Sequence, residues 1–374
     1  MKKIFAINCG STSTKVAYFE DDKMISKVSL DITAEQLKKM PKTLDQLEYR
    51  TNQVKEFLKV NKLDPAEFDI IVSRAGTIPS VPYDGAYEVN ELMIASVTYA
   101  PEAQHASTLS CLIADQLVKG LDVPVIIYDP TCVDSADEIA KVTGIPEIVN
   151  MPIAHLLNTK AAGITYAESI GKNYKDLNLI IVQLGGGITL GFHDHGRIAD
   201  WVYDDEGPMS PQRAGAIPTR YMANLCYNSD KTLQEMRMYL CGQSGLVAYF
   251  GTQDVRDVEK IIDKGDKKAE LILKALSYQV AKSIGQLSVV RDGKVDQIIL
   301  TGGIAYSERI TNWIKEKVSF IAPVTIIPGE REMEALAAGA LRVLNKEEEV
   351  HPYNVYPKGY SSIEEIINNP NYLA

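Results

Sequence analysis

The sequence predicts an α/β protein with two related halves, and three observations support this. Apolar stretches typical of β-strands alternate with helical stretches along the chain, which leads us to expect mostly parallel sheets. A strand, a glycine turn and a second strand open both the first 30 residues and the stretch that starts at residue 177. No low-complexity linker separates the halves, so we expect them to pack around a cleft.

The first half opens with three expected strands. IFAIN, KVAYF and residues 23–30 have the apolar, β-rich character of strands, and GSTST forms the first turn. Residues 34–62 have helical spacing, and residues 68–72 and 123–128 are short buried strands. Between these two strands lie a loop rich in Pro, Gly and Tyr (76–87) and a helix (104–118). Residues 153–170 are expected to form a long helix.

The second half repeats this order of elements. LIIVQL, ITLGFH and RIADWVY are expected strands joined by the turns GGG and DHG. Helices are expected at 218–226, 233–239, 255–263, 267–290, 307–317 and 331–345, and strands at 295–300 and 323–327. The repeat is one of pattern and not of letters, and it favours an internal duplication.

The composition is that of a folded protein with a sizeable core. The chain has 374 residues, of which 45% are hydrophobic and 24% charged, and these values exclude disordered and fibrous classes. At roughly 150 residues per domain, this length favours two domains. The net charge of −10 disfavours nucleic acid and anionic membranes as partners. No apolar run approaches the ~20 residues that span a bilayer.

Cysteine usage and the first residues indicate a cytoplasmic protein. The five cysteines are scattered and include no CxxC pair, which argues against a disulfide framework or a structural zinc site. Such a set fits a reducing compartment. The opening MKKIFAINCG has too short an apolar stretch for a signal peptide and is better explained as a first strand.

Three glycine turns follow apolar strands, and each has the chemistry of an anion site. They are residues 8–15 (NCGSTSTK), 185–189 (GGGIT) and 301–304 (TGGI). Glycine lets backbone N–H groups approach an anion, and the hydroxyls and lysine of the first turn add donors suited to phosphoryl oxygens. One such turn alone is more simply a tight hairpin, but three favour a phosphate site. GxxxxGK[ST] is absent, which excludes a P-loop.

The first turn, INCGSTSTK, resembles the opening phosphate loop of the acetate and butyrate kinase family, part of the larger group of acetate and sugar kinases, Hsp70 and actin. The resemblance runs along almost the whole chain, and DEGPMSPQRAG and ILTGGIAYS bring it nearer to the butyrate branch. Further motifs follow in the order that butyrate kinases show: RAGTIPSVPYDGAYEVNELM, YAPEAQHAS, IIYDP, HLLNTKA, VQLGGGITLG, GLVAYFGTQDVRDVE, YQVAKSIG and PGEREMEALAAGAL.

The resemblance implies two duplicated actin-like (ribonuclease H-like) domains with a deep cleft between them. Residues 1–152 and 335–374 would form an acid-binding N-terminal domain, because the C-terminal helix of similar proteins packs back on that domain. Residues 153–334 would form the nucleotide-binding domain. A homodimer or a higher homo-oligomer is also implied.

The implied reaction moves the γ-phosphoryl group of ATP reversibly to a short-chain carboxylate, namely butyrate or a branched analogue such as isobutyrate, and gives an acyl phosphate and ADP. A carboxyl group titrates near pH ~4, so the acid is already ionised near neutrality and needs no general base. The protein must instead hold two anions in line and offset their charge, which calls for cations, N–H donors and Mg²⁺.

Five residues are candidates for catalysis or acid binding. By resemblance Arg74 binds the acid, Arg213 contacts the transferring phosphoryl group, His155 donates to the phosphoryl oxygens, and Asp129 is the catalytic carboxylate. His105 matches the family and is assigned to substrate binding. From the residues alone, each arginine is more simply a member of a surface ion pair and His155 a capped or core histidine, whereas Asp129 is equally an Asp-Pro turn or a helix cap.

The remaining matched residues are assigned to the metal, the phosphates and the nucleotide. By resemblance Glu332 binds Mg²⁺ together with Asn8. Glu334 lies about 200° further round a helix, so only one of the two glutamates faces the site; a plain acidic first turn of a helix is the alternative. The residues that match the phosphate and nucleotide loops are Asn8, Ser11, Ser13, Lys15, Gln183, Gly185, Gly186, Gly187, Asp254, Arg256, Gly302, Gly303 and Ile304.

Three positions depart from the family pattern. Cys9 stands where proline is usual, Ala75 where a second glycine is usual beside Arg74, and Gln183 where a histidine is usual. Glutamine donates a hydrogen bond but carries no positive charge. The loss of a charge-assisted donor costs ~1.5–3 kcal/mol, which is roughly 10- to 100-fold in rate if the whole loss falls on the transition state.

Three alternatives stay open at this point. A nucleotide-binding regulator with little turnover is favoured by Gln183 and opposed by the other matched residues. A sugar kinase of the same superfamily is opposed by the apolar loop IPSVPY (78–83), which suits an alkyl tail better than sugar hydroxyls. A kinase of acetate or propionate differs from the leading interpretation only in its acid.

Overall fold

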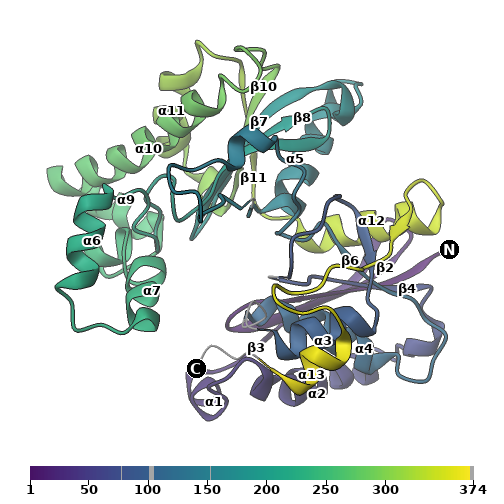
Figure 1. Cartoon of the computed structure of the whole chain (residues 1–374). Helices are drawn as coiled ribbons and strands as arrows, with labels where there is room; N and C mark the ends of the chain where they lie inside the picture. The colour runs from purple at the N-terminus through teal and green to yellow at the C-terminus, as the bar shows by residue number, and fades with distance from the viewer. Residues whose placement is uncertain (77, 101–104, 152, 371–374) are drawn as a thin grey trace. The chain divides into compact units, whose positions relative to one another are not determined.

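The computed structural model describes residues 1–76, 78–100, 105–151 and 153–370 (Figure 1). The chain divides into two compact units. The first unit is Met1–Asp134 together with Arg331–Ala374, and the second is Ser135–Glu330. The C-terminal segment therefore belongs to the first unit.

A mixed seven-stranded sheet forms the centre of the first unit in the described residues, in the order β12-β5-β6-β4-β1-β2-β3. Strands β1, β4 and β6 are neighbours and run parallel, whereas β1, β2 and β3 form an antiparallel meander. The strands are β1 (Lys3–Cys9), β2 (Ser13–Glu20), β3 (Lys23–Asp31), β4 (Ile70–Ser73), β5 (Ala86–Glu88), β6 (Val125–Tyr128) and β12 (Val350–His351).

Helices α4 (Leu109–Leu117) and α12 (Glu332–Leu344) pack on β1, β4 and β6. Helix α12 approaches β6 so closely that a Cβ at Gly339 would stand 2.6 Å from ring atoms of Tyr128. This contact fixes the C-terminal segment on the first sheet. The other helices of this unit are α1 (Ala34–Lys39), α2 (Leu47–Val60), α3 (Glu91–Tyr99) and α13 (Ile363–Asn368).

The second unit repeats five strands of the first. Its sheet has the order β11-β10-β7-β8-β9, in which β7, β8 and β9 form an antiparallel meander and β7, β10 and β11 run parallel. This is the arrangement of β6-β4-β1-β2-β3, so the predicted duplication is confirmed. The strands are β7 (Asn178–Leu184), β8 (Ile188–Asp194), β9 (Arg197–Val202), β10 (Gln297–Gly302) and β11 (Val324–Pro328).

Helices cover both faces of the second sheet because alternate residues of its buried strands point to opposite sides. Ile180 and Val182 of β7 pack with α10 and α11, which lie side by side, whereas Leu179 and Ile181 pack with α5 (Figure 1). The helices of this unit are α5 (Leu156–Ser169), α6 (Thr219–Tyr227), α7 (Leu233–Gly242), α8 (Leu246–Phe250), α9 (Val255–Asp263), α10 (Lys267–Leu287) and α11 (Glu308–Val318).

The unit boundary differs from the expected one, because residues 135–151 belong to the second unit. The backbone N–H of Asp137 donates to the carbonyl of Ala199 at 2.9 Å, and Arg291 and Arg197 each hold its carboxylate at 2.7 Å. The hydrogen bond from Arg291, with that from Arg197, keeps the pKa of Asp137 below its usual range. The expected boundary at residue 152 falls outside the described residues.

The expectation of mostly parallel sheets is wrong. Of the ten strand pairs in the described residues, five are parallel and five antiparallel. The two meanders supply four of the antiparallel pairs, because short turns join antiparallel neighbours. The parallel pairs join strands that are separated by longer stretches of chain.

The other expected strands and helices are present with ends that shift by a few residues, except that the helical stretch expected at 34–62 divides into α1 and α2. The helix expected at 104–118 begins at Leu109 after the 3₁₀ turn Ala106–Thr108, and residue 104 lies outside the described part. Strands β5 and β12 were not predicted because three and two residues show no periodicity. Helix α3 was missed although Asn90 caps it by accepting from the N–H of Met93 at 3.0 Å.

All five cysteines lie in the described part of the chain and are free thiols. Burial raises the pKa of Cys9, Cys111 and Cys132, so these three behave as small buried groups. None of the helices that the structure describes combines the length and the apolar character that crossing a membrane requires.

The end of β10 yields a stability prediction. Gly302 has φ of 90°, and a Cβ there would stand 2.4 Å from the carbonyl oxygen of Leu184. Gly302→Ala should lower the free energy of unfolding by about 1–3 kcal/mol, because left-handed strain adds to a backbone clash. Gly303→Ala is the matched control, since no described atom lies within 4 Å of a Cβ there. Urea unfolding measures both, and equal losses would contradict the prediction.

Candidate active site

Three neighbouring strand ends bring candidate residues of the first unit to one edge of its sheet. Strands β1, β4 and β6 run parallel in register, so their carboxyl ends lie at the same edge. Asn8 lies near the end of β1, Arg74 follows β4, and Asp129 follows β6. Functional groups of α/β sheets gather at this edge. The structure therefore assembles three of the predicted residues here.

Arg74 is a buried guanidinium. The residue is 8% exposed, and its backbone N–H donates to the carbonyl of Ile7 at 3.2 Å. Its side chain has no hydrogen bond or ion pair with any residue that the structure describes. Arg74 is therefore no surface ion-pair member. A buried charge without a counter-charge is costly, and an anionic ligand would remove that cost.

Asp129 is fixed by Gly85 in an unusual backbone conformation. Its φ is 43°, its N–H donates to the carbonyl of Gly85 at 2.9 Å, and its Oδ1 accepts from the N–H of Gly85 at 2.8 Å. Non-glycine residues with positive φ concentrate at functional sites. These two hydrogen bonds give the Asp129 carboxylate a structural role in a turn. They also hold its buried side chain in place at the sheet edge.

Asn8 and Glu332 contact each other, and Glu334 does not join them. Asn8 Nδ2 donates to Glu332 Oε2 at 2.6 Å, whereas Glu334 lies 3.6 Å from the ammonium of Lys27. The two glutamates therefore diverge on α12, as their spacing predicts. Of this pair, only Glu332 lies against the first glycine turn.

The residues present fit a magnesium ion held mainly by substrate. Mg²⁺ usually takes one or two protein carboxylates and completes its shell with phosphates and water. Glu332 provides one carboxylate, and its side chain has no cationic partner among the described residues. The described residues include no group of three His, Cys, Asp or Glu side chains that could hold a metal alone.

The first glycine turn is closed by a bond from Gly10 N to Ser13 O at 2.8 Å. Ser11 is exposed, and the half-buried Lys15 has no ion pair with any described residue. Cys9 donates its N–H to Ser110 Oγ at 2.8 Å, a bond that the usual proline could not make. This departure thus ties the turn to α4.

His105 caps the 3₁₀ turn before α4. Its Nδ1 accepts from the N–H of Ser107 at 3.2 Å and also contacts Ser107 Oγ, and the residue is exposed. This capping bond gives a local structural reason for a histidine at this position. The assignment of His105 to substrate binding stays a prediction.

The second and third glycine turns lie side by side in the second unit. The turn Gly185–Gly187 follows β7, and Gly302 ends the parallel neighbour β10, whose backbone touches that of Leu184. Gly302 N also donates to Gly329 O at 3.2 Å, beside the end of β11. Ile304 is 9% exposed and packs in the core behind the third turn. Three strand ends again meet at one edge.

The side-chain amide of Gln183 forms hydrogen bonds inside the protein. The residue is 2% exposed, its Nε2 donates to Glu330 Oε1 at 3.2 Å, and its Oε1 accepts from Asn158 Nδ2. The side chain therefore links α5 to the segment after β11. It supplies no positive charge where the family usually has histidine.

His155 lies at the start of α5 without capping it. No side-chain capping bond is made, and Nδ1 instead pairs with Thr189 Oγ1 at 2.9 Å. Thr189 lies in β8, two residues after Gly187. His155 is therefore held beside the second glycine turn, and its assignment as a hydrogen-bond donor to phosphoryl oxygens stays a prediction.

Arg213 and Asp204 form an ion pair against the same turn. Arg213 Nη2 lies 3.1 Å from Asp204 Oδ2, and a Cβ at Gly187 would stand 2.3 Å from that oxygen. Burial raises the pKa of Asp204 to about 6, although Arg213 opposes that rise. The sequence did not predict Asp204, because nothing in the run Asp204-Asp205 shows which carboxylate is buried.

Asp254 and Arg256 form an ion pair with each other on the surface. Asp254 caps α9 by accepting from Arg256 N at 2.9 Å, and its Oδ2 lies 2.6 Å from Arg256 Nη2. The hydrogen bonds from Arg256 lower the pKa of Asp254 to about 2. The structure thus accounts for both residues locally and does not join them to the glycine turns.

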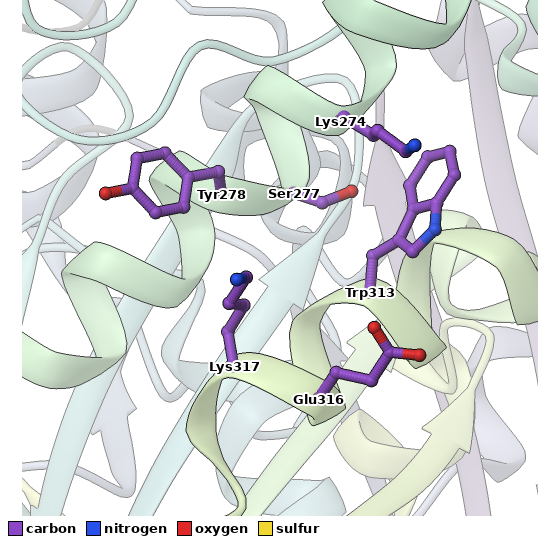
Figure 2. Close-up of a pocket in the computed structure, with 6 residues that line it drawn as sticks. All are labelled: Lys274, Ser277, Tyr278, Trp313, Glu316 and Lys317. Carbon is purple, nitrogen blue, oxygen red and sulfur yellow. The ribbon is translucent and has the colours of Figure 1, made fainter.

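A pocket of about 320 Å³ lies between α10 and α11 (Figure 2). Its aromatic wall is Trp313, and the ammonium of Lys274 lies 5.3 Å from the centre of the Trp313 ring and 2.8 Å from Glu270. None of its lining residues is a predicted site residue. The pocket is therefore not counted in the candidate active site.

Residues 159–324 match the acetokinase family. The chain is 40% identical over 355 residues to butyrate kinase 1 of Clostridium acetobutylicum, which covers 94% of this chain and 100% of that protein. It is 43% identical over 354 residues to a probable butyrate kinase of Bacteroides thetaiotaomicron, and the match covers 94% of this chain and 99% of that protein.

Solved structures show the same fold. The acetate kinase of Porphyromonas gingivalis matches with a TM-score of 0.74 at 17% identity, covering 92% of this chain and 100% of that one. A propionate kinase of Francisella tularensis matches with a TM-score of 0.70 at 19% identity, covering 91% and 99%. The expected actin-like architecture is thereby confirmed.

The buried Asp204 predicts a pH-dependent stability. Its pKa is raised from 3.8 to about 6, so the folded chain holds this proton more tightly than the unfolded chain. The resulting stability is lost as the pH rises from about 4 to about 6, by at most about 3 kcal/mol. Asp204→Asn cannot ionise and should escape this loss.

Urea unfolding at pH 4.5 and 7.5 tests the prediction on the difference between wild type and Asp204→Asn. The free energy of unfolding of Asp204→Asn, relative to that of the wild type, should be higher at pH 7.5 than at pH 4.5. Asp205→Asn, whose parent side chain is half exposed, is the control and should show little change. A pH-independent difference for Asp204→Asn would contradict the buried, protonatable carboxyl.

Proposed function

Because the chain belongs to the acetokinase family, we propose that it transfers the γ-phosphoryl group of ATP to butyrate or a short branched analogue. The products are an acyl phosphate and ADP, and the reaction is reversible. The observation that supports this most is Arg74, a buried guanidinium whose side chain no described residue pairs. A carboxylate is the anion that its planar fork fits best.

An apolar surrounding of Arg74 supports an acid with an alkyl tail. Burial raises the pKa of Cys132, and the positive charge of Arg74 opposes that rise. The backbone N–H of Val81 donates to the carbonyl of Cys132 at 3.0 Å, and Ile78 and Val81 are both buried. A sugar would leave its hydroxyls unpaired beside such groups.

The second unit offers the donors that a nucleotide phosphate needs. The amides of the second and third glycine turns, His155 and Arg213 are the proposed contacts to the phosphoryl oxygens. They act by offsetting charge and fixing position, because a carboxylate nucleophile needs no base. Mg²⁺, for which Glu332 is the proposed ligand together with Asn8, would add positive charge at those oxygens.

A nucleotide-binding regulator with little turnover is the second candidate. Gln183 favours it, since this amide bonds to Asn158 and Glu330 and carries no charge. The free cysteines and the need for ATP fit a cytoplasmic location for either candidate. A homodimer stays an expectation, which light scattering on the purified protein tests.

Trapping of acyl phosphates with hydroxylamine tests the proposed reaction. With Mg-ATP, we expect hydroxamate from butyrate or isobutyrate in preference to acetate, propionate and valerate. Arg74→Gln should lower kcat/KM for the acid roughly 100- to 1,000-fold, because a bidentate charged bond is lost. Arg309→Gln, which removes a surface ion pair with Asp263, is the control. No hydroxamate from any acid, together with ATP binding, would favour the regulator.

The glutamine at position 183 predicts a gain of rate. Gln183→His should raise kcat by up to roughly 10- to 100-fold, because a protonated histidine restores a charge-assisted donor and Glu330 beside it favours protonation. The gain should fade as the pH rises and the imidazole loses its proton. Initial rates between pH 6 and 9 measure it, and an unchanged kcat at every pH refutes the inferred defect.

A further inference from the structure

Arg50 is a fully buried arginine behind the first glycine turn. It lies in α2, is 0% exposed, and donates hydrogen bonds only to neutral acceptors. Three of these bonds reach the turn: Nη2 to Ser11 O at 3.1 Å, Nη1 to Ser13 O at 2.9 Å, and Nη1 to Thr14 Oγ1 at 3.0 Å. Two more go to Gln46 Oε1, from Nε at 3.1 Å and from Nη2 at 2.9 Å.

No carboxylate in the described residues forms an ion pair with this guanidinium. Burial lowers the pKa of Arg50, and the titratable group beside it is Cys9. Burial raises the pKa of Cys9, so the thiol stays neutral and supplies no counter-charge. A buried arginine is usually paired with an acid. Arg50 therefore leaves an uncompensated positive charge directly behind the turn.

The bonds from Arg50 also orient the peptides of the turn. In a trans peptide the N–H points opposite to the C=O. Because the carbonyl of Ser11 points toward Arg50, the N–H of Thr12 points away from it. The turn thus directs the N–H of Thr12 away from a positive charge, as in backbone sites for anions.

We propose that Arg50 is a positioning residue for an anion at the first glycine turn, residues 8–15, where it fixes the turn and supplies the positive charge behind it. The identification of this anion as the transferring phosphoryl group rests on the proposed function. The anion site itself rests on Arg50 and its neutral partners alone.

Gln46→Glu separates this role from a purely structural one. The substitution keeps the size of the side chain and places a carboxylate on the atom that accepts two bonds from Arg50. It should therefore keep the turn in place and neutralise the buried charge. We expect the melting temperature without ligand to be equal or higher, since a paired guanidinium is less costly to bury.

Binding of inorganic phosphate is the direct readout, measured as the rise in melting temperature with phosphate concentration. Gln46→Glu should weaken phosphate binding and lower kcat, each roughly 3- to 10-fold, while the KM for the carboxylate changes less. Asn52→Asp adds the same charge at an exposed position of α2 and is the matched control. Lys15→Gln, in the turn itself, should weaken phosphate binding as well.

Unchanged phosphate binding and unchanged kcat in Gln46→Glu would overturn the proposal and leave Arg50 as a structural residue. Arg50→Lys gives a second test, because it keeps the charge and loses the fork: it should bind phosphate better than Arg50→Met at temperatures where both are folded. Equal binding by these two variants would also overturn the electrostatic role.

The proposal and the proposed function fail in different ways. If the wild type forms acyl phosphate and Gln46→Glu behaves like Asn52→Asp, the kinase stands and the role of Arg50 does not. If no acid gives acyl phosphate but Gln46→Glu still weakens phosphate binding, the anion site stands and its assignment to phosphoryl transfer does not.

Discussion

Parallel strands that end at one edge are the constraint on which both units depend. Neighbouring parallel strands finish side by side, so the segments after them meet without any long-range device. In the first unit this edge carries Asn8, Arg74 and Asp129, and in the second it carries the second and third glycine turns. The antiparallel meanders complete each sheet and supply the hairpin in which a glycine turn sits. One five-strand plan thus generates two sets of anion-facing groups.

Charge is arranged differently in the two units. The first unit buries Arg50 and Arg74 without carboxylate partners among the described residues, and this uncompensated charge favours an anion at the sheet edge. In the second unit Arg213 is paired with Asp204, whose raised pKa shows that burial is only partly offset. On the surface of the second unit, Arg256 and Asp254 form an ion pair, and their assignment to nucleotide binding stays a prediction.

The sequence predicted much of the fold because strand and helix periodicity is local. It also predicted the edge residues Arg74 and Asp129, since each directly follows a buried strand. It missed Asp204, the partners of Gln183 and the role of Arg50, because such pairings depend on packing between segments far apart in the chain. The mixed sheet was missed for a related reason: the meanders were recognised as hairpins but not weighed against the parallel strands.

In the proposed reaction, the carboxylate itself attacks the γ-phosphorus of ATP. Phosphoryl transfer to butyrate labelled with ¹⁸O in both carboxyl oxygens tests this directly by ³¹P NMR. We expect one ¹⁸O in the bridge between carbon and phosphorus, seen as an isotope shift of the acyl phosphate resonance. An acyl phosphate resonance without that shift would contradict attack by the carboxylate. ATP hydrolysis without formation of an acyl phosphate would contradict it as well.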